Sequence, residues 1–172
     1  MALTIAGSDS GGGAGVQADL KTFAALGVYG ASVITAITAQ NTRTVSKILE
    51  LPPAMVAAQI DAVAQDLTIQ AFKTGMIANA AIIETVAAKA CQHRLKNLVV
   101  DPVMVAKSGA LLLRKSAVQA LRSRLFPLAT VVTPNIPEAE ELTGLALRND
   151  NAIKDAARKI FDMGAQSVVI KG

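Results

Sequence analysis

A glycine-dense stretch near the N-terminus reads GSDSGGGAGVQADLK over residues 7–21. It follows a short apolar run, Ala2–Ala6, and leads into a helical pattern from Val16 to Leu26. A strand, a glycine-dense turn and a helix start together form a ligand site at the carboxyl end of the strand. Four glycines within residues 11–15 exceed what a plain turn needs. We expect their backbone N–H groups to attract an anion or the polar edge of a ring.

Two common nucleotide-binding motifs do not fit this loop. The dinucleotide fingerprint fails because Val16 stands where a third glycine is needed after Gly11 and Gly13. Gly7 and Gly12 have the glycine spacing of a P-loop, but the lysine and the hydroxyl residue that should follow are missing. A nucleotide-binding oxidoreductase is therefore disfavoured.

Bulk composition narrows the class of protein. The chain has 172 residues, of which 52% are hydrophobic and only 3% aromatic, which indicates a single domain over residues 1–172 with an aliphatic core. No membrane span or signal peptide is expected, and the single cysteine, Cys91, fits a reducing cytoplasm. A net charge of +4 suits an anionic small molecule, while the shortage of aromatic side chains argues against nucleic acid as a partner.

Apolar runs alternate with amphipathic helical patterns along the whole chain. This alternation predicts βαβ units and therefore an α/β fold, a mostly parallel sheet with helices on both faces. The expected strands are Ala2–Ala6, Ala31–Ile37, Val45–Leu51, Ala71–Met76, Leu98–Val103, Thr130–Thr133 and Ser167–Ile170. The expected helices are Gly15–Leu26, Pro53–Gln65, Asn79–His93, Lys115–Arg124, Ile136–Thr143 and Asn151–Met163.

Polar residues follow nearly every expected strand, which predicts a binding cleft at the carboxyl edge of the sheet. The amides of Gln40 and Asn41 offer a donor and an acceptor to an aminopyrimidine edge, although turn chemistry explains them equally well. Asp19, about one turn inside its helix, either balances the helix dipole or accepts a hydrogen bond from a ligand. The first part of the cleft is therefore expected near the glycine-dense loop.

We expect the second part of the cleft to contain both acidic and basic side chains. Asp101 follows an apolar run, where a carboxylate must be paired or hold a cation such as Mg²⁺. Asn135 and Glu138 have the spacing of a capping box, and they are equally placed to face phosphates and hydrated Mg²⁺. Lys171, at the end of the last expected strand, either meets nucleotide phosphates or is a surface lysine.

Several motifs resemble one enzyme family. The residues that carry the resemblance are the loop at residues 6–21, Ala39-Gln40-Asn41-Thr42, Lys73-Thr74-Gly75-Met76, Asp101–Gly109 and Thr133–Ala139. In this order they resemble the hydroxymethylpyrimidine/phosphomethylpyrimidine kinases of thiamine biosynthesis, which belong to the ribokinase-like superfamily. The resemblance implies a ribokinase-like fold and transfer of the γ-phosphoryl group of ATP to a pyrimidine alcohol and then to its monophosphate.

The resemblance also implies roles for individual residues. Those matching the pyrimidine pocket are Gly7, Asp19, Gln40, Met76 and Val103. Asn135 and Lys171 match nucleotide-contacting positions, and Glu138, together with Asp101, is expected to help bind Mg²⁺. Residues 106–109 resemble a loop that closes over the substrate.

One part of the family pattern is missing from the sequence. In the family, a later glycine-rich element forms an anion hole and carries the residue that activates the attacking hydroxyl. No stretch resembles it here, so the resemblance implies a kinase domain that is incomplete at the C-terminus, either a fragment of a longer kinase or a truncated protein, with the activating residue expected beyond Gly172. We expect the 172-residue chain to bind the pyrimidine weakly and to phosphorylate it poorly or not at all. A homodimer is also expected. A pyridoxal or pyridoxine kinase and a non-catalytic pyrimidine-binding protein are the alternatives.

Overall fold

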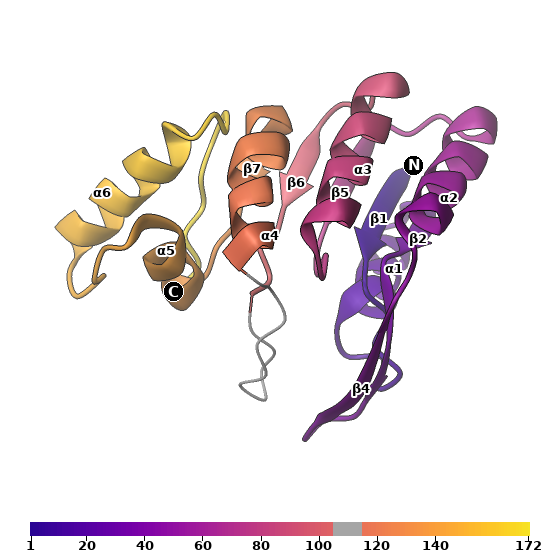
Figure 1. Ribbon diagram of the computed structural model, residues 1–172, viewed down its shortest axis with the longest axis horizontal. Coiled ribbons are helices and arrows are strands. Elements are labelled where there is room, and N and C mark those ends of the chain that lie inside the picture. The colour runs from indigo at the N-terminus through magenta and orange to yellow at the C-terminus, as the bar shows by residue number, and fades with distance from the viewer. Residues whose placement is uncertain (105–114) are drawn as a thin grey trace.

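A computed structural model describes residues 1–104 and 115–172. Its main sheet has five parallel strands in the order β2-β1-β5-β6-β7 (Figure 1). The strands are β1 Ala2–Ala6, β2 Gly30–Ile34, β3 Ala36–Gln40, β4 Val45–Glu50, β5 Ala71–Thr74, β6 Leu98–Val100 and β7 Ala129–Val132. The helices are α1 Gly15–Ala25, α2 Pro53–Asp66, α3 Ala80–Gln92, α4 Lys115–Ala120, the π-helical η1 Leu121–Leu125, the 3₁₀-helical η2 Phe126–Leu128, α5 Ile136–Thr143 and α6 Asp150–Phe161.

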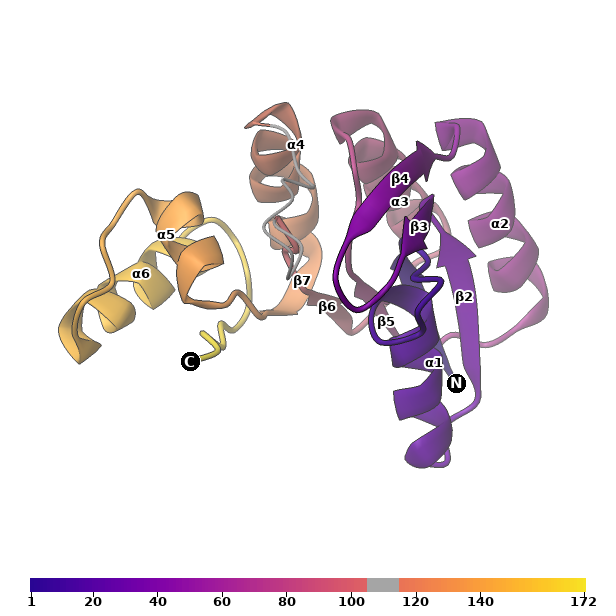
Figure 2. The same ribbon diagram turned by 90° about the horizontal axis from the view of Figure 1, so that it is seen from below.

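Helices cover both faces of the sheet, as the alternating pattern predicted. Helices α2, α3 and α4 lie side by side on one face, and α1 lies on the other (Figure 2). Helix α1 approaches β2 at Gly30, where a Cβ atom would lie 2.8 Å from side-chain carbons of Leu20 and Phe23. Helices α5 and α6 pack together beyond β7 (Figure 1). None of the described helices is both long and apolar enough to span a bilayer.

The two faces of the sheet differ in polarity. Leu3, Phe72 and Leu98 are in register on adjacent strands and are almost fully buried, so they form one layer of the aliphatic core. Thr4, Lys73 and Val99 are the next residues along the same strands, and they therefore point to the opposite face. That face is covered by α1 at β1, and it carries the polar groups of the candidate site.

An ion-pair cluster joins α2 to α3 on the surface. Asp61 of α2 accepts hydrogen bonds from Lys89 Nζ and His93 Nε2, both at 2.6 Å. These hydrogen bonds, from His93 first and Lys89 second, lower the pKa of Asp61 below its ordinary value of 3.8. The cluster joins two helices on the opposite face of the sheet from α1, so it is independent of the ion pairs of the candidate site.

The expected strand Ala31–Ile37 was wrong as a single strand. The chain leaves the main sheet at Thr35, whose N–H donates to the Ala6 carbonyl (2.9 Å) and whose hydroxyl donates to the Met76 carbonyl (2.8 Å). The first of these is the last bond of the parallel β1–β2 ladder; beyond it, the Thr35 carbonyl accepts from Leu51 N–H (2.9 Å) instead of from the chain that follows β1. The following residues form β3, which pairs antiparallel with β4 in a separate two-stranded sheet. The expected strand Val45–Leu51 is therefore part of a hairpin that projects beyond the carboxyl edge (Figure 1).

Other boundaries also shifted. Ser167–Ile170 is not a strand; it approaches β7 through a single parallel bridge, Val132 with Val168, and Lys171 bridges to Asn135. The strand expected at Leu98–Val103 ends at Val100, because Val103 N–H donates to the Asp101 carbonyl (2.9 Å) in a tight turn. The expected helix Lys115–Arg124 changes to π-helical geometry at Leu121. The loop expected at residues 106–109 lies outside the described residues.

Candidate functional site

The glycine-dense loop is organised around the carboxylate of Asp9. Asp9 is only 5% exposed, and its Oδ1 accepts from the N–H of Gly11 at 2.8 Å. Its Oδ2 accepts from the N–H groups of Gly13 (3.0 Å) and Ala14 (2.8 Å). The loop is thus a backbone nest that already holds an anion from its own chain. The expectation that these N–H groups attract a ligand was wrong for these three, because Asp9 occupies them.

Gly15 closes the loop against the end of β1. Its φ of +57° lies in the left-handed region, and a Cβ atom there would stand 2.2 Å from the Gly7 carbonyl oxygen. The same carbonyl accepts from the N–H of Val16 at 3.0 Å, so helix α1 begins in direct contact with β1. Only glycine fits this position.

Gly7 and Met76 meet at the carboxyl edge of the sheet. Gly7 N–H donates to the Met76 carbonyl at 3.2 Å, and a Cβ atom on Gly7 would touch Met76 Sδ and Cε at 3.4 Å. Val103, two residues beyond Asp101, follows the neighbouring strand β6. Three of the five residues expected around the pyrimidine therefore follow the adjacent parallel strands β1, β5 and β6.

Gln40 and Asn41 separate into two different roles. Ser10 Oγ donates to the Gln40 carbonyl (2.6 Å) and accepts from its N–H (2.8 Å), which fixes the end of β3 against the loop. The Gln40 side chain has one long contact, from Thr38 Oγ1 at 3.4 Å, and is otherwise available to a ligand within the described part of the chain. Asn41 Oδ1 accepts from two backbone N–H groups of its own turn, so turn chemistry accounts for that residue.

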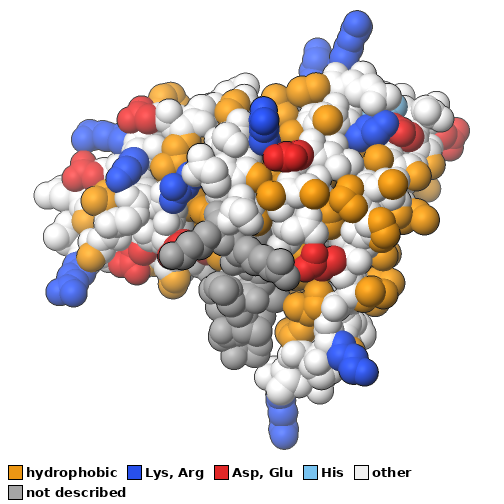
Figure 3. All heavy atoms as spheres, viewed as in Figure 1, with side chains coloured by type: hydrophobic (Ala, Val, Ile, Leu, Met, Phe, Trp, Pro, Cys, Tyr) orange, Lys and Arg blue, Asp and Glu red, His pale blue; other side chains and the backbone are white. Residues whose placement is uncertain are grey.

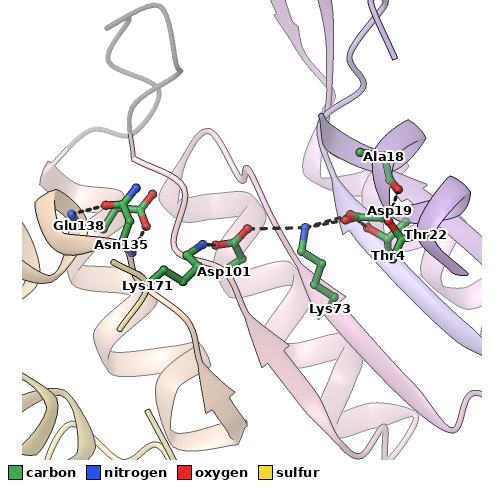
Figure 4. A network of polar contacts seen from close by, with 9 residues as sticks. All are labelled: Thr4, Ala18, Asp19, Thr22, Lys73, Asp101, Asn135, Glu138 and Lys171. Atoms are coloured by element: carbon green, nitrogen blue, oxygen red, sulfur yellow. Dashed lines mark hydrogen bonds and ion pairs between the residues drawn. The ribbon is translucent and has the colours of Figure 1, made fainter. Parts of the chain in front are cut away.

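A row of alternating charges crosses the sheet on the α1 side (Figure 4). Asp19 of α1 accepts from Thr4 Oγ1 at 2.6 Å and pairs with Lys73 Nζ, which lies 3.0 Å from both of its carboxylate oxygens. Lys73 also lies 3.8 Å from Asp101 Oδ2, and Lys171 Nζ donates to Asp101 Oδ1 at 2.8 Å. Asp19 therefore does more than balance the helix dipole, because Thr4 and Lys73 already contact its carboxylate.

Asn135 and Glu138 form the capping box that their spacing predicted. The Asn135 side chain accepts from Glu138 N–H, and Glu138 Oε2 accepts from Asn135 N–H, both at 2.8 Å. Glu138 is 6% exposed, and burial raises the pKa of its carboxyl above the ordinary 4.5. The negative charge of Asp101 adds to this increase, whereas the Asn135 N–H bond and the charge of Lys171 oppose it. Capping and a role toward phosphates are compatible, since the box lies beside Asp101 and Lys171.

The described residues contain no group of three or more acidic, histidine or cysteine side chains able to hold a metal. Asp101 and Glu138 nevertheless suit Mg²⁺, which in proteins is typically held by one or two carboxylates with water and substrate phosphates. Each carboxylate already has protein partners, so a cation would share them. A separate hollow of about 240 Å³, lined by Phe72, Cys91, Arg94 and Leu128 among others, contains none of the predicted site residues.

Sequence reasoning missed Lys73 and Asp9 as members of the site. Lys73 is the one charged residue in the apolar strand β5, and that pattern was the available signal. Asp9 stands within the glycine-dense loop, but nothing in the sequence shows that its carboxylate turns inward. The structure thus has two groups along one edge, Gly7 with Met76 and Gln40 at one end and Asp101 with Lys171, Asn135 and Glu138 at the other.

Known proteins are similar to this chain in sequence and in fold. A family model described as phosphomethylpyrimidine kinase matches residues 9–172. A hydroxymethylpyrimidine/phosphomethylpyrimidine kinase of Haemophilus influenzae is 55% identical over 99% of this chain and 63% of its own length. The crystal structure of a Clostridium difficile phosphomethylpyrimidine kinase is 49% identical with a TM-score of 0.93, over 99% of this chain and 74% of that one.

A pyridoxal kinase is also similar. The Staphylococcus aureus pyridoxal kinase in complex with AMP-PCP and pyridoxal is 42% identical with a TM-score of 0.87, over 99% of this chain and 61% of that one. The chain spans 35% of the length of one curated relative and 63–65% of several others. The resemblance noted in the sequence and the ribokinase-like α/β fold are both confirmed by these similarities. The chain belongs to the phosphomethylpyrimidine kinase family.

Proposed function

We propose that this chain contributes the pyrimidine site and part of the phosphate site of an ATP-dependent kinase acting on 4-amino-5-hydroxymethyl-2-methylpyrimidine and on its monophosphate. The observation that carries the proposal is the order of groups along the carboxyl edge. The uncharged contact between Gly7 and Met76 lies at one end, and the paired Asp101 and Lys171 lie at the other. A neutral ring and a polyanion could therefore bind along the same edge.

At the ring end, the proposed contacts are apolar surface and amides. Met76 provides a polarizable side chain beside the open Cα of Gly7, which suits the face of an aromatic ring. The Gln40 amide donates and accepts at the ring edge. The carboxylate of Asp19, which now accepts from Thr4 and pairs with Lys73, accepts from a ring amine.

At the phosphate end, the proposed roles are charge neutralisation and positioning. Lys171 exchanges its contact with Asp101 for a contact with nucleotide phosphates. Asp101 and Glu138 would hold Mg²⁺, which supplies charge neutralisation at the transferred phosphoryl group when bound. Asn135 fixes Glu138 through the capping box, so the carboxylate keeps one orientation. Phosphoryl transfer needs mainly such positioning and electrostatic support from the protein.

A calorimetric titration of the chain with the hydroxymethylpyrimidine tests the ring end. Gln40→Ala removes one ligand hydrogen bond, which is worth about 0.5–1.5 kcal/mol, so we expect an affinity about 2- to 12-fold weaker. The matched control is Gln65→Ala, an exposed glutamine on α2, which we expect to leave affinity unchanged. Absence of pyrimidine binding by the unmodified chain would refute the proposal. Transfer from ATP with Mg²⁺ is assayed in the same samples, because poor turnover stays a prediction.

A second candidate function is phosphorylation of pyridoxal. The observation that favours it is the similarity to the pyridoxal kinase of S. aureus. The same calorimetric titration with pyridoxal, and with the two ligands in competition, separates the candidates. We expect the hydroxymethylpyrimidine to bind more tightly than pyridoxal. Tighter binding of pyridoxal would identify pyridoxal as the better candidate substrate.

We infer that the chain forms a homodimer, and the β3–β4 hairpin supports this. Ile37 and Leu49 are register partners on one face of the hairpin and are 47% and 63% exposed, and Ile48, 41% exposed, points to the other face. Apolar side chains gather over α2 and where the hairpin leaves the sheet, while basic side chains stand at its tip (Figure 3). Contiguous exposed apolar surface favours association. Light scattering should give a dimer mass for the chain and a monomer mass for Leu49→Lys; a monomer for both would contradict the inference.

A further inference from the structure

The ammonium group of Lys73 is shared by two carboxylates that belong to opposite ends of the site. It lies 3.0 Å from both oxygens of Asp19 and 3.8 Å from Asp101 Oδ2 (Figure 4). All three side chains are partly buried, with exposed fractions of 22% for Lys73, 16% for Asp19 and 21% for Asp101. Partial burial weakens solvent screening, so a change in the contacts of one carboxylate alters the electrostatic interactions of the other.

The structure holds the two carboxylates more firmly than the cation. Thr4 Oγ1 donates to Asp19 Oδ2 at 2.6 Å, and Thr4 is fully buried, which anchors Asp19. Asp101 follows β6, with its N–H bonded to the Thr74 carbonyl at 2.9 Å. Lys73 extends along the open face, and Gly75 leaves room for it, since a Cβ atom there would lie 3.1 Å from Nζ. The flexible lysine is therefore the group able to move between the two carboxylates.

We propose that Lys73 is a positioning residue that couples pyrimidine binding at Asp19 to nucleotide binding at Asp101 and Lys171. This inference rests on the function proposed above. A ring amine that donates to Asp19 competes with Lys73 for the same oxygens, and the ammonium shifts toward Asp101. Asp101 then attracts Lys171 less strongly, and Lys171 is released toward the nucleotide phosphates. Each ligand consequently tightens the binding of the other.

The expected size of the effect follows from typical couplings between sites, which are about 5- to 150-fold. Because one ammonium carries the whole effect, we expect a value near the lower end, about 10-fold. Linkage requires the nucleotide affinity to rise by the same factor when the pyrimidine is present. The coupling is therefore measurable from either ligand.

The experiment is a calorimetric titration with 4-amino-5-hydroxymethyl-2-methylpyrimidine, with and without saturating AMP-PCP, and without Mg²⁺, because a metal ion on Asp101 would compete with the ammonium of Lys73. It compares the unmodified chain with Lys73→Met, Lys73→Arg and Lys89→Met. The last is a matched control, because Lys89 is a similarly buried lysine, 19% exposed, paired with Asp61 at 2.6 Å away from the site. We expect about 10-fold coupling in the unmodified chain and in Lys89→Met, less than about 2-fold in Lys73→Met, and partial recovery in Lys73→Arg.

The outcomes separate this inference from the proposed function. If the unmodified chain binds no pyrimidine, the proposed function fails and the inference fails with it. If it binds both ligands independently, or if Lys73→Met keeps full coupling, the proposed function stands and the role of Lys73 is overturned. A purely structural lysine would lower thermal stability in Lys73→Met without changing the ratio of affinities. Should Lys73→Met not fold, the Lys73→Arg variant and the reciprocal titration of AMP-PCP decide the question.

Discussion

Replacing Asp9 by asparagine is expected to destabilise the fold through the glycine-dense loop. Asparagine has a single acceptor oxygen and no charge, so it can satisfy the N–H of Gly11 or those of Gly13 and Ala14, but not all three. Hydrogen bonds to charged groups contribute about 1.5–3 kcal/mol each. The three donors belong to exposed residues, where water replaces part of what is lost. We therefore expect a net loss of about 2–4 kcal/mol, well below the simple sum.

The assay for this prediction is urea unfolding, with thermal unfolding as a second measurement. For a chain of this size, 1 kcal/mol corresponds to a Tm shift of about 2–4 °C, so Asp9→Asn should lower Tm by about 4–16 °C. The control is Asp66→Asn, because Asp66 is exposed at the end of α2, and we expect a change within about 0.5 kcal/mol. An Asp9→Asn variant as stable as the control would refute the view that this carboxylate organises the loop.

The remaining predictions concern one backbone position and two carboxylates. Gly15→Ala should cost at least about 3 kcal/mol in urea unfolding, because a Cβ atom meets the Gly7 carbonyl, whereas Gly27→Ala, also at positive φ but in open space, should cost about 1 kcal/mol. Glu138→Gln keeps the capping box and removes a buried carboxyl group whose pKa is raised, so the free energy of unfolding at pH 7 should be unchanged or higher. The calorimetric affinity for AMP-PCP with Mg²⁺ should fall about tenfold or more, because a carboxylate ligand is lost. A loss of stability in Glu138→Gln without a loss of nucleotide affinity would contradict the proposed Mg²⁺ role of Glu138. Asp61, whose pKa is lowered, stabilises the fold above its ordinary value of 3.8, and this contribution is lost as the pH falls through the lower folded value. The difference in urea stability between the unmodified chain and Asp61→Asn should therefore be constant near neutral pH and shrink below about pH 4; a constant difference down to pH 2 would count against the ion-pair cluster.

Local patterns predicted the elements whose signals are local. Asn135 and Glu138 stand three residues apart at a helix start, and the structure has the capping box that this spacing predicts. The helix Ile136–Thr143 has the predicted bounds because a cap at one end and Gly144 at the other both appear in the sequence. The order of the βαβ units could be predicted in the same way from the alternation of apolar runs and helical patterns, because the hydrophobic period and the length of each run are properties of short segments.

Features decided by distant partners were not predictable from those patterns. The run Ala31–Ile37 reads as one apolar strand, and its division at Thr35 involves distant partners, because the Thr35 carbonyl accepts from Leu51 N–H and its hydroxyl donates to the Met76 carbonyl. The sequence places Asp19 about one turn inside its helix, but its contacts with Thr4 and Lys73 depend on how α1 packs over β1 and β5. The site residues of the pyrimidine end therefore remain proposals, whereas their position at the carboxyl edge is observed.

The inward carboxylate of Asp9 also affects which ligands each end of the edge can accept. An approaching phosphate finds at the glycine-dense loop a fixed negative charge in the place where other loops of this composition present bare N–H groups. The N–H groups of Gly11, Gly13 and Ala14 are therefore not open to a phosphate, whereas the ammonium of Lys171 lies at the other end of the edge. For the substrate proposed above, this difference favours one orientation, with the uncharged ring toward the loop and the phosphorylated arm toward the lysine.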